Sequence, residues 1–182
     1  VKGGYYLLFF LMAVFFIANY ELFSVFNKST TILFLDLLLI LALFSIYSLA
    51  NPLDEDKDTS FYILLWVIIL CVCSDVGGYV FGRTFKWKKL TKISPKKTVS
   101  GVLGSFVLSL VSVFIIDIVS SDQNFLDPKY FFLAIIFSLV AQTGDLTISY
   151  LKRLEKIKDT GKILPGHGGI FDRIDGLMFV VI

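Results

Sequence analysis

The chain has 182 residues, of which 56% are hydrophobic and only 18% are charged, against about 25% charged residues in a typical soluble domain. Its 19 phenylalanines cannot all be buried in one small water-soluble core. This composition excludes a soluble globular domain, a disordered chain and a nucleic-acid-binding protein, and it indicates an integral membrane protein. The formal net charge of +2 identifies no partner by itself.

Several apolar stretches are long enough to cross a bilayer as helices, which takes about 20 residues each. In chain order they are residues 5–26, 31–50, 61–81, 101–119 and 130–150, and a further stretch begins near residue 176. These runs are too continuous for the alternating strands of an outer-membrane barrel. The sequence therefore predicts an all-α, polytopic membrane bundle with five full spans and the start of a sixth.

The two ends of the chain indicate a piece of a longer membrane protein. Val1 is not an initiator methionine, and the apolar segment that starts at Gly176 stops at Ile182, which is too short to span a bilayer. We therefore expect further residues at both ends.

The connections between the predicted spans alternate in charge. Residues 54–58 sum to −3 and residues 120–129 to −1, whereas residues 83–98 sum to +7 and residues 151–175 to +2. Positively charged loops stay on the cytoplasmic side of a membrane. We therefore expect 83–98 and 151–175 to lie together on the cytoplasmic face of the membrane.

Two aspartates interrupt the apolar spans close to that face. Asp75 lies about six residues before the end of the third span and Asp145 lies similarly in the fifth, on the order of 10 Å below the surface. A charge at this depth is costly unless it faces a polar cavity, a cation or a partner. The alternative is that each membrane span ends earlier, at Ser74 and Gly144, and leaves ordinary interfacial aspartates.

A first polar cluster surrounds the basic connection between the third and fourth spans. Its candidate phosphate-binding residues are Arg83, Ser94, Lys96, Lys97 and Thr98. Most of them precede the fourth span, where a helix N-terminus offers free N–H groups to an anion. The alternative is a basic loop that anchors the helix to the anionic headgroups of membrane lipids.

A second polar cluster begins at the end of the fifth span. Ser149 lies four residues after Asp145, and Lys152 and Arg153 lie three and four residues after Ser149. On a helix this pattern places a carboxylate, a hydroxyl and cations along one stripe. The arrangement is suited to binding both a metal ion and a phosphate.

The same cluster ends in two further aspartates and the only histidine. Asp172 and Asp175 are three residues apart, so both carboxylates can face one cation if the segment is helical; the alternative is an exposed helix start. Several carboxylates with a single histidine favour Mg²⁺ over Zn²⁺. Glycines flank His167, whose role stays open between hydrogen bonding to a phosphate or carboxylate and acid–base catalysis.

Taken together, these groups indicate phosphoryl or nucleotidyl transfer to or from a lipid. Cations would bind phosphates, carboxylates would bind Mg²⁺, and the site lies at the depth of lipid headgroups. A membrane transporter with intramembrane carboxylates is the alternative from a different class. Such a transporter would more often show an internal repeat and would not need the long polar segment after the fifth span.

One long motif closely resembles the signature of the phosphatidate cytidylyltransferases (CDP-diacylglycerol synthases). It reads Ser-Tyr-Leu-Lys-Arg…Lys-Asp-Thr-Gly…Leu-Pro-Gly-His-Gly-Gly-Ile-Phe-Asp-Arg-Ile-Asp over residues 149–175. The Gly-Asp-Leu at 144–146 and the Ser-Pro-Lys-Lys-Thr at 94–98 resemble other polar segments of that family. The resemblance covers residues 70–180.

The resemblance implies an Mg²⁺-dependent enzyme that makes CDP-diacylglycerol and pyrophosphate from CTP and phosphatidate. The predicted organisation is N-terminal spans over 1–60 and a catalytic transmembrane domain over 61–182, with the polar loops 83–98 and 151–175. The resemblance implies a homodimer in a bacterial-type inner (plasma) membrane, with its active face on the cytoplasmic side. The enzyme alternative is a cytidylyltransferase for another lipid or polyprenol phosphate. With the clusters above, the predicted site comprises catalytic Asp145, Lys152, Asp172 and His167; metal ligands Asp75, Asp145, Asp172 and Asp175; and substrate-binding Arg83, Ser94, Lys96, Lys97, Thr98, Ser149 and Arg153.

Overall fold

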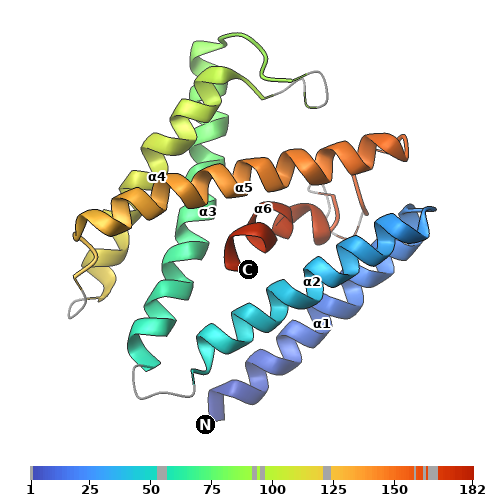
Figure 1. Cartoon of the computed structure of the whole chain (residues 1–182), viewed down its shortest axis with the longest axis horizontal. Coiled ribbons are helices and arrows are strands. Elements are labelled where there is room, and N and C mark those ends of the chain that lie inside the picture. The colour runs from blue at the N-terminus through green and yellow to red at the C-terminus, as the bar shows by residue number, and fades with distance from the viewer. Residues whose placement is uncertain are drawn as a thin grey trace.

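The computed structural model is a bundle of helices (Figure 1). The described residues are 2–52, 57–91, 94, 97–120, 124–157, 159–161, 163 and 168–182. Within them the helices are α1 (Lys2–Val25), α2 (Ser29–Ala50), α3 (Lys57–Phe85), α4 (Val99–Ser120), α5 (Pro128–Leu154) and α6 (Phe171–Val181). The predicted all-α architecture is confirmed.

Helices α1 to α5 are the candidate membrane spans. All 5 are long and apolar enough to cross a bilayer, and α6, with 11 residues, is the predicted start of a sixth. Helices α3 and α5 run past the predicted ends at residues 81 and 150. Ser74 and Gly144 therefore lie inside continuous helices, and Asp75 and Asp145 follow them without a break in the helix.

Helices α3 and α4 lie side by side with their backbones in close contact (Figure 1). A Cβ atom added to Gly77 would lie 2.7 Å from the carbonyl carbon of Gly104, and one added to Gly101 would lie 2.8 Å from the carbonyl oxygen of Gly78. Small residues at such crossings allow membrane helices to approach closely. Gly77 and Gly78 of α3 and Gly101 and Gly104 of α4 therefore allow the two helices to pack closely.

Helix α6 packs between α5 and α2 near the centre of the bundle (Figure 1). The core here joins buried side chains of five helices: Leu22 of α1, Leu39 of α2, Val67 of α3, Ile148 of α5 and Met178 of α6. A second core surrounds Trp66 of α3. The first core thus includes residues from both sides of the predicted division at residue 60, which itself stays a prediction.

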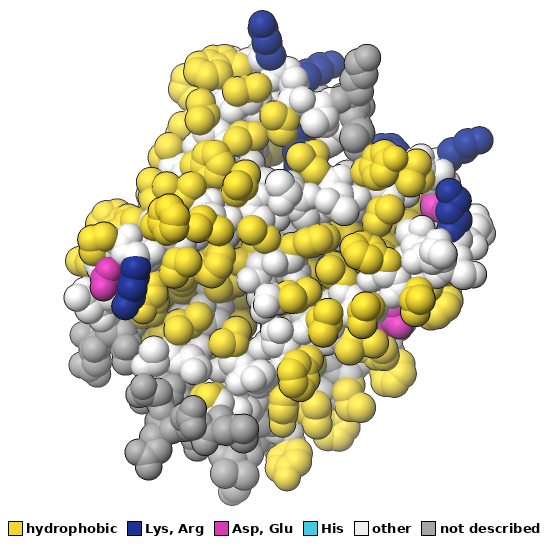
Figure 2. All heavy atoms as spheres, viewed as in Figure 1, with side chains coloured by type: hydrophobic (Ala, Val, Ile, Leu, Met, Phe, Trp, Pro, Cys, Tyr) yellow, Lys and Arg dark blue, Asp and Glu magenta, His cyan; other side chains and the backbone are white. Residues whose placement is uncertain are grey.

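The connections alternate between two ends of the bundle. In Figure 1, α2 and α4 end and α3 and α5 begin toward the lower left, whereas the α1–α2 turn and the C-terminal ends of α3 and α5 lie toward the top and right. Apolar side chains cover most of the face in Figure 2. Phe9 and Ile118, for example, are 74% and 80% exposed, as expected for helices whose outer surfaces contact lipid.

Candidate active site

A cavity of about 400 Å³ opens among α3, α4, α5 and α6. Its lining comprises Ser74, Asp75, Gly78, Tyr79, Ser94, Lys97, Thr98, Gly101, Val102, Ser105, Gln142, Asp145, Asp172, Arg173 and Asp175. The four aspartates predicted as metal ligands all belong to this lining, although they come from three helices. Asp172 and Asp175 lie in the first turns of α6. The segment is therefore helical, as the sequence required for both carboxylates to lie on one face.

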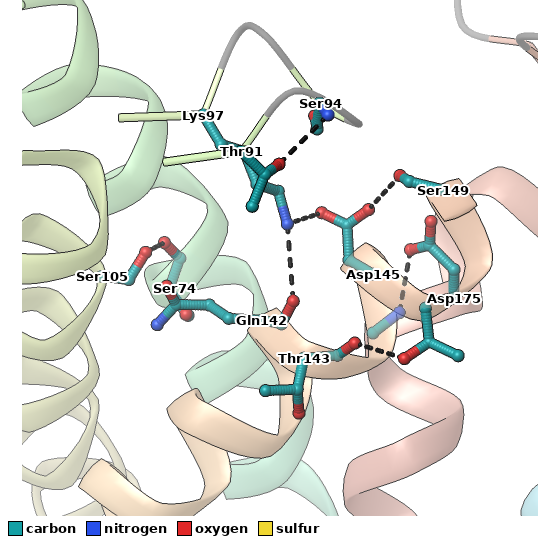
Figure 3. Close-up of polar contacts among 12 residues, drawn as sticks. Ser74, Thr91, Ser94, Lys97, Ser105, Gln142, Thr143, Asp145, Ser149 and Asp175 are labelled. Atoms are coloured by element: carbon teal, nitrogen blue, oxygen red, sulfur yellow. Dashed lines mark hydrogen bonds and ion pairs between the residues drawn. The ribbon is translucent and has the colours of Figure 1, made fainter. Parts of the chain in front are cut away.

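Asp145 is held between a lysine and a serine (Figure 3). Lys97 Nζ lies 2.5 Å from Asp145 Oδ2, and Ser149 Oγ donates to Asp145 Oδ1 at 3.2 Å. The Lys97 ammonium also donates to the backbone carbonyl of Gln142 at 3.5 Å. The Lys97 and Asp145 side chains remain 25% and 32% exposed, so the ion pair faces the cavity and stays within reach of a ligand.

Asp172 is fixed more completely than Asp145. Lys152 Nζ lies 2.9 Å from Asp172 Oδ1, while Oδ2 accepts the backbone N–H groups of Thr160 at 2.8 Å and Gly169 at 3.0 Å. Burial raises the pKa of Asp172, but these hydrogen bonds, led by that from Lys152, outweigh it and hold the pKa below its ordinary value. Asp172 is therefore an ionised anchor that orients Lys152.

Asp175 has the opposite environment. Burial and the negative charge of Asp145 raise the pKa of Asp175 to about 7. Asp175 Oδ1 accepts the adjacent backbone N–H of Gly176 at 2.8 Å. A carboxylate that repels its neighbours in this way is stabilised in its charged form when a cation binds beside it.

The floor of the cavity is polar. Ser105 Oγ donates to the backbone carbonyl of Ser74 at 2.7 Å, and the Ser74 and Ser138 hydroxyls are hydrogen-bonded at 2.9 Å. The Gln142 amide donates to Ser138 Oγ at 3.2 Å. Figure 3 shows Ser74, Ser105 and Gln142 on the side of the site next to α4. Hydroxyl and amide groups at this depth suit a phosphate-bearing headgroup better than an acyl chain.

The donor set fits a magnesium ion that is shared with a substrate. Among the described residues, no three histidine, cysteine, aspartate or glutamate side chains form a ready metal cluster. Mg²⁺ is usually bound by only one or two carboxylates together with water and substrate phosphates. Asp75, Asp145 and Asp175 line the cavity and suit this role, whereas both Asp172 oxygens already accept hydrogen bonds.

The structure brings some of the predicted phosphate-binding residues to the cavity. Ser94, Lys97 and Thr98 line it. Thr98 Oγ1 also accepts the backbone N–H of Gly101 at 3.1 Å and so caps the start of α4. The predicted helix N-terminus is therefore present beside the site, which is suitable for an anion.

Other predicted residues lie beside the cavity or point away from it. Ser149 contacts Asp145, and Arg83 donates to the Tyr79 hydroxyl at 2.7 Å. Arg153 is exposed and donates to the carbonyl of Ile157 at 2.9 Å, so the one-stripe prediction does not extend to it. The remaining two, Lys96 and His167, lie outside the described residues.

Two charged residues near the site were not assigned from the sequence. Arg173 lines the cavity and lies within the second polar cluster, which is the signal that could have identified it. Glu21 of α1 is 1% exposed and hydrogen-bonds the start of α6. The sequence feature that could have identified Glu21 is its position as an acidic residue inside an apolar span.

Fold and cavity together define a class: polytopic helical membrane proteins with a lysine- and carboxylate-lined cavity near one end of the bundle. The chain belongs to the Cytidylyltransferase family, whose pattern matches residues 1–182. The resemblance seen in the sequence is thereby confirmed.

Several curated relatives bear the name phosphatidate cytidylyltransferase. The protein of Helicobacter pylori is 38% identical over 138 residues, covering 76% of this chain and 48% of that protein. The protein of Staphylococcus saprophyticus is 39% identical over 130 residues, with 71% and 50% coverage. That of Rickettsia felis is 42% identical over 123 residues, with 62% and 54% coverage. The chain thus spans about half the length of the curated relatives it matches.

Proposed function

We propose that the protein transfers a cytidylyl group from CTP to phosphatidate, giving CDP-diacylglycerol and pyrophosphate. The family and the relatives named phosphatidate cytidylyltransferase support this reaction. The observation that carries the proposal is the convergence of Lys97, Asp145 and Asp175 on one cavity. These groups provide what a reaction between two phosphates requires: positioning and charge neutralisation.

In the proposed reaction, a phosphate oxygen of phosphatidate attacks the α-phosphorus of CTP. A new P–O bond forms, and the bond to the β-phosphate oxygen breaks as pyrophosphate leaves. The second pKa of a phosphate monoester is about 6, so the attacking group is largely deprotonated at neutral pH. The site therefore needs no dedicated general base, and its main task is to offset repulsion between two anions.

In the proposal, two lysines offset this repulsion in different ways: one can move to a substrate phosphate, and the other is held in place. Lys97 faces the cavity and can exchange its contact with Asp145 for a substrate phosphate. Lys152 does not belong to the cavity lining; it is held by Asp172, with side chains only 10% and 7% exposed, and contributes a fixed positive charge from α5. Arg173, near the start of α6, adds a third basic group.

We assign the proposed Mg²⁺ to Asp145 and Asp175, with Asp75 as the further ligand available on α3. Bound there, Mg²⁺ would neutralise phosphate oxygens as charge develops. Asp172, predicted from the sequence as a ligand, is better suited to orienting Lys152. Asp145 and Asp175 line the same cavity, and a cation bound beside both carboxylates would offset their mutual repulsion.

We further propose that the α3–α4 and α5–α6 connections face the cytoplasm from an inner membrane. The charge of +7 in residues 83–98 and the positive-inside rule support this orientation. A water-soluble nucleotide would then enter from the cytoplasm, and the lipid substrate from the surrounding leaflet. The homodimer remains a prediction from the family resemblance.

A substrate panel tests the proposed reaction. The protein in detergent micelles with Mg²⁺ and radiolabelled CTP is offered phosphatidate, a polyprenyl phosphate or no lipid acceptor. We expect labelled CDP-diacylglycerol with phosphatidate only. Turnover with polyprenyl phosphate alone would establish the alternative acceptor, and no CTP turnover with either lipid would contradict the enzyme assignment in favour of a transporter.

A further inference from the structure

Glu21 is a buried carboxylate on a helix that supplies no residue to the cavity lining. It lies in α1 and is 1% exposed. A carboxylate within an apolar span is costly unless specific partners compensate it. Its partners therefore indicate why the chain keeps a carboxylate at this position.

Both oxygens of Glu21 accept hydrogen bonds from the start of α6. Oε1 accepts the backbone N–H of Ile170 at 3.0 Å, and Oε2 accepts that of Phe171 at 3.0 Å. Ile170 itself provides no side-chain cap. Glu21 thus supplies, from another helix, the N-terminal cap that the local sequence lacks, and its negative charge suits the positive end of the helix dipole.

The segment before α6 leaves room for this carboxylate by means of two glycines. A Cβ atom added to Gly161 would lie 2.5 Å from Glu21 Oε1, and one added to Gly169 would collide with Oε2. The N–H groups of Gly169 and Thr160 donate to Asp172. Glu21 and Asp172 therefore hold the same backbone segment from two sides.

We infer that Glu21 is a positioning residue for the site: it fixes the start of α6 so that Asp172 faces Lys152 and Asp175 faces the cavity beside Asp145. The consequence for turnover rests on the proposed function, whereas the fixed start of α6 does not. Helix α1 would then serve the reaction without touching a substrate.

The test compares Glu21→Gln with Asn19→Ala. Glu21→Gln keeps the size of the side chain but replaces one acceptor oxygen by an NH₂ group. This NH₂ group would face the backbone N–H of Ile170 or Phe171, donor against donor, so that hydrogen bond is lost. Asn19 lies on the same helix, and its side chain donates to the Phe15 carbonyl of that helix at 3.3 Å, so Asn19→Ala is the matched control. Gly161→Ala is the second variant, because it disturbs Glu21 without removing a polar group.

Hydrogen–deuterium exchange and Mg²⁺ activation are measured on each protein. Because a hydrogen bond to a charged group is lost, Glu21→Gln and Gly161→Ala should accelerate exchange over residues 169–173 by roughly tenfold or more, with other helices unchanged. The half-activating Mg²⁺ concentration should rise severalfold, which a mere loss of folded protein would not produce. Asn19→Ala should change neither quantity.

Unchanged exchange over residues 169–173 in both variants would overturn the inference, as would acceleration spread evenly over the whole chain. An unchanged half-activating Mg²⁺ concentration, despite local acceleration, would reduce Glu21 to a structural cap and would also overturn it. Failure of the proposed function is distinguishable, because the wild-type protein would then be inactive while the exchange comparison remained readable.

Discussion

At the scale of single residues, chemically identical carboxylates acquire different tasks from their surroundings. Asp172 and Asp175 are one helical turn apart in α6. Lys152 and two backbone N–H groups lower the pKa of Asp172 against the effect of burial, whereas burial and Asp145 raise the pKa of Asp175. The first environment anchors a lysine, and the second favours an added cation.

This contrast predicts different responses to Asp172→Asn and Asp175→Asn. Mg²⁺ that binds the folded protein should raise its melting temperature. Asp175→Asn should abolish this rise, because it removes a proposed ligand, while Asp172→Asn should lower the melting temperature at all Mg²⁺ concentrations yet keep the rise. Thermal denaturation with and without Mg²⁺ measures both, and loss of the rise in Asp172→Asn alone would instead support Asp172 as the ligand.

The Lys97–Asp145 pair yields a second residue-scale prediction. Lys97→Gln should lower kcat/KM for CTP by about 10²-fold, the order expected when one charge-stabilising group is removed from a reacting site. Lys88 lies in the same connection but is exposed, so Lys88→Gln is the matched control and should retain activity. Equal losses in the two variants would show that general basic charge, rather than the position of Lys97, is what matters.

At the scale of elements, the site depends on the close crossing of α3 and α4. A Cβ on Gly77 would meet the backbone of Gly104, so the crossing also sets how the α3–α4 connection presents Lys97 to α5. Helix α3 itself carries Asp75 to the cavity. Small changes at this contact should therefore alter both the stability of the protein and the geometry of the site.

We expect Gly77→Val to destabilise the protein by about 1–3 kcal/mol, the usual cost of overpacking, and to reduce turnover as α3 moves from α4. The neighbouring lipid-facing residue Val76 is 47% exposed, and Val76→Leu should leave both quantities unchanged. Denaturation in detergent and the CTP assay give the measurements. A stable and active Gly77→Val protein would show that the crossing is not required.

Much of the fold could be predicted from the sequence, because spans depend on local runs of apolar residues. Asp75 and Asp145 could likewise be predicted as cavity residues, since their depth in the membrane demands a partner. The partners themselves could not be predicted. Lys152 shares a helical stripe with Asp145 but pairs with Asp172, and Glu21 binds residues 149 and 150 positions away, which no local pattern reveals.

At the scale of the whole molecule, alternating connections place the basic segments at one end of the bundle (Figure 1). The cavity lies toward that end, between α3–α4 on one side and α5–α6 on the other. Because charge pattern and helix order agree, the orientation in the membrane can be tested independently of activity.

Impermeant thiol labelling in intact cells tests the orientation. In a background with Cys71→Ala and Cys73→Ala, we expect Asn124→Cys to react from outside and Lys88→Cys to react only after permeabilisation. Both positions are exposed, so a difference reports the side of the membrane rather than burial. The reverse labelling pattern would contradict a cytoplasmic site.

The most direct test of the central claim is the conversion of radiolabelled CTP and phosphatidate by Asp145→Asn, with Asp127→Asn as its control. Asp145 holds Lys97 and faces the cavity, whereas Asp127 caps the opposite end of α5. The account predicts that Asp145→Asn makes no detectable CDP-diacylglycerol while remaining folded, and that Asp127→Asn keeps its turnover. Wild-type turnover in Asp145→Asn would contradict the assignment of this cavity as the active site.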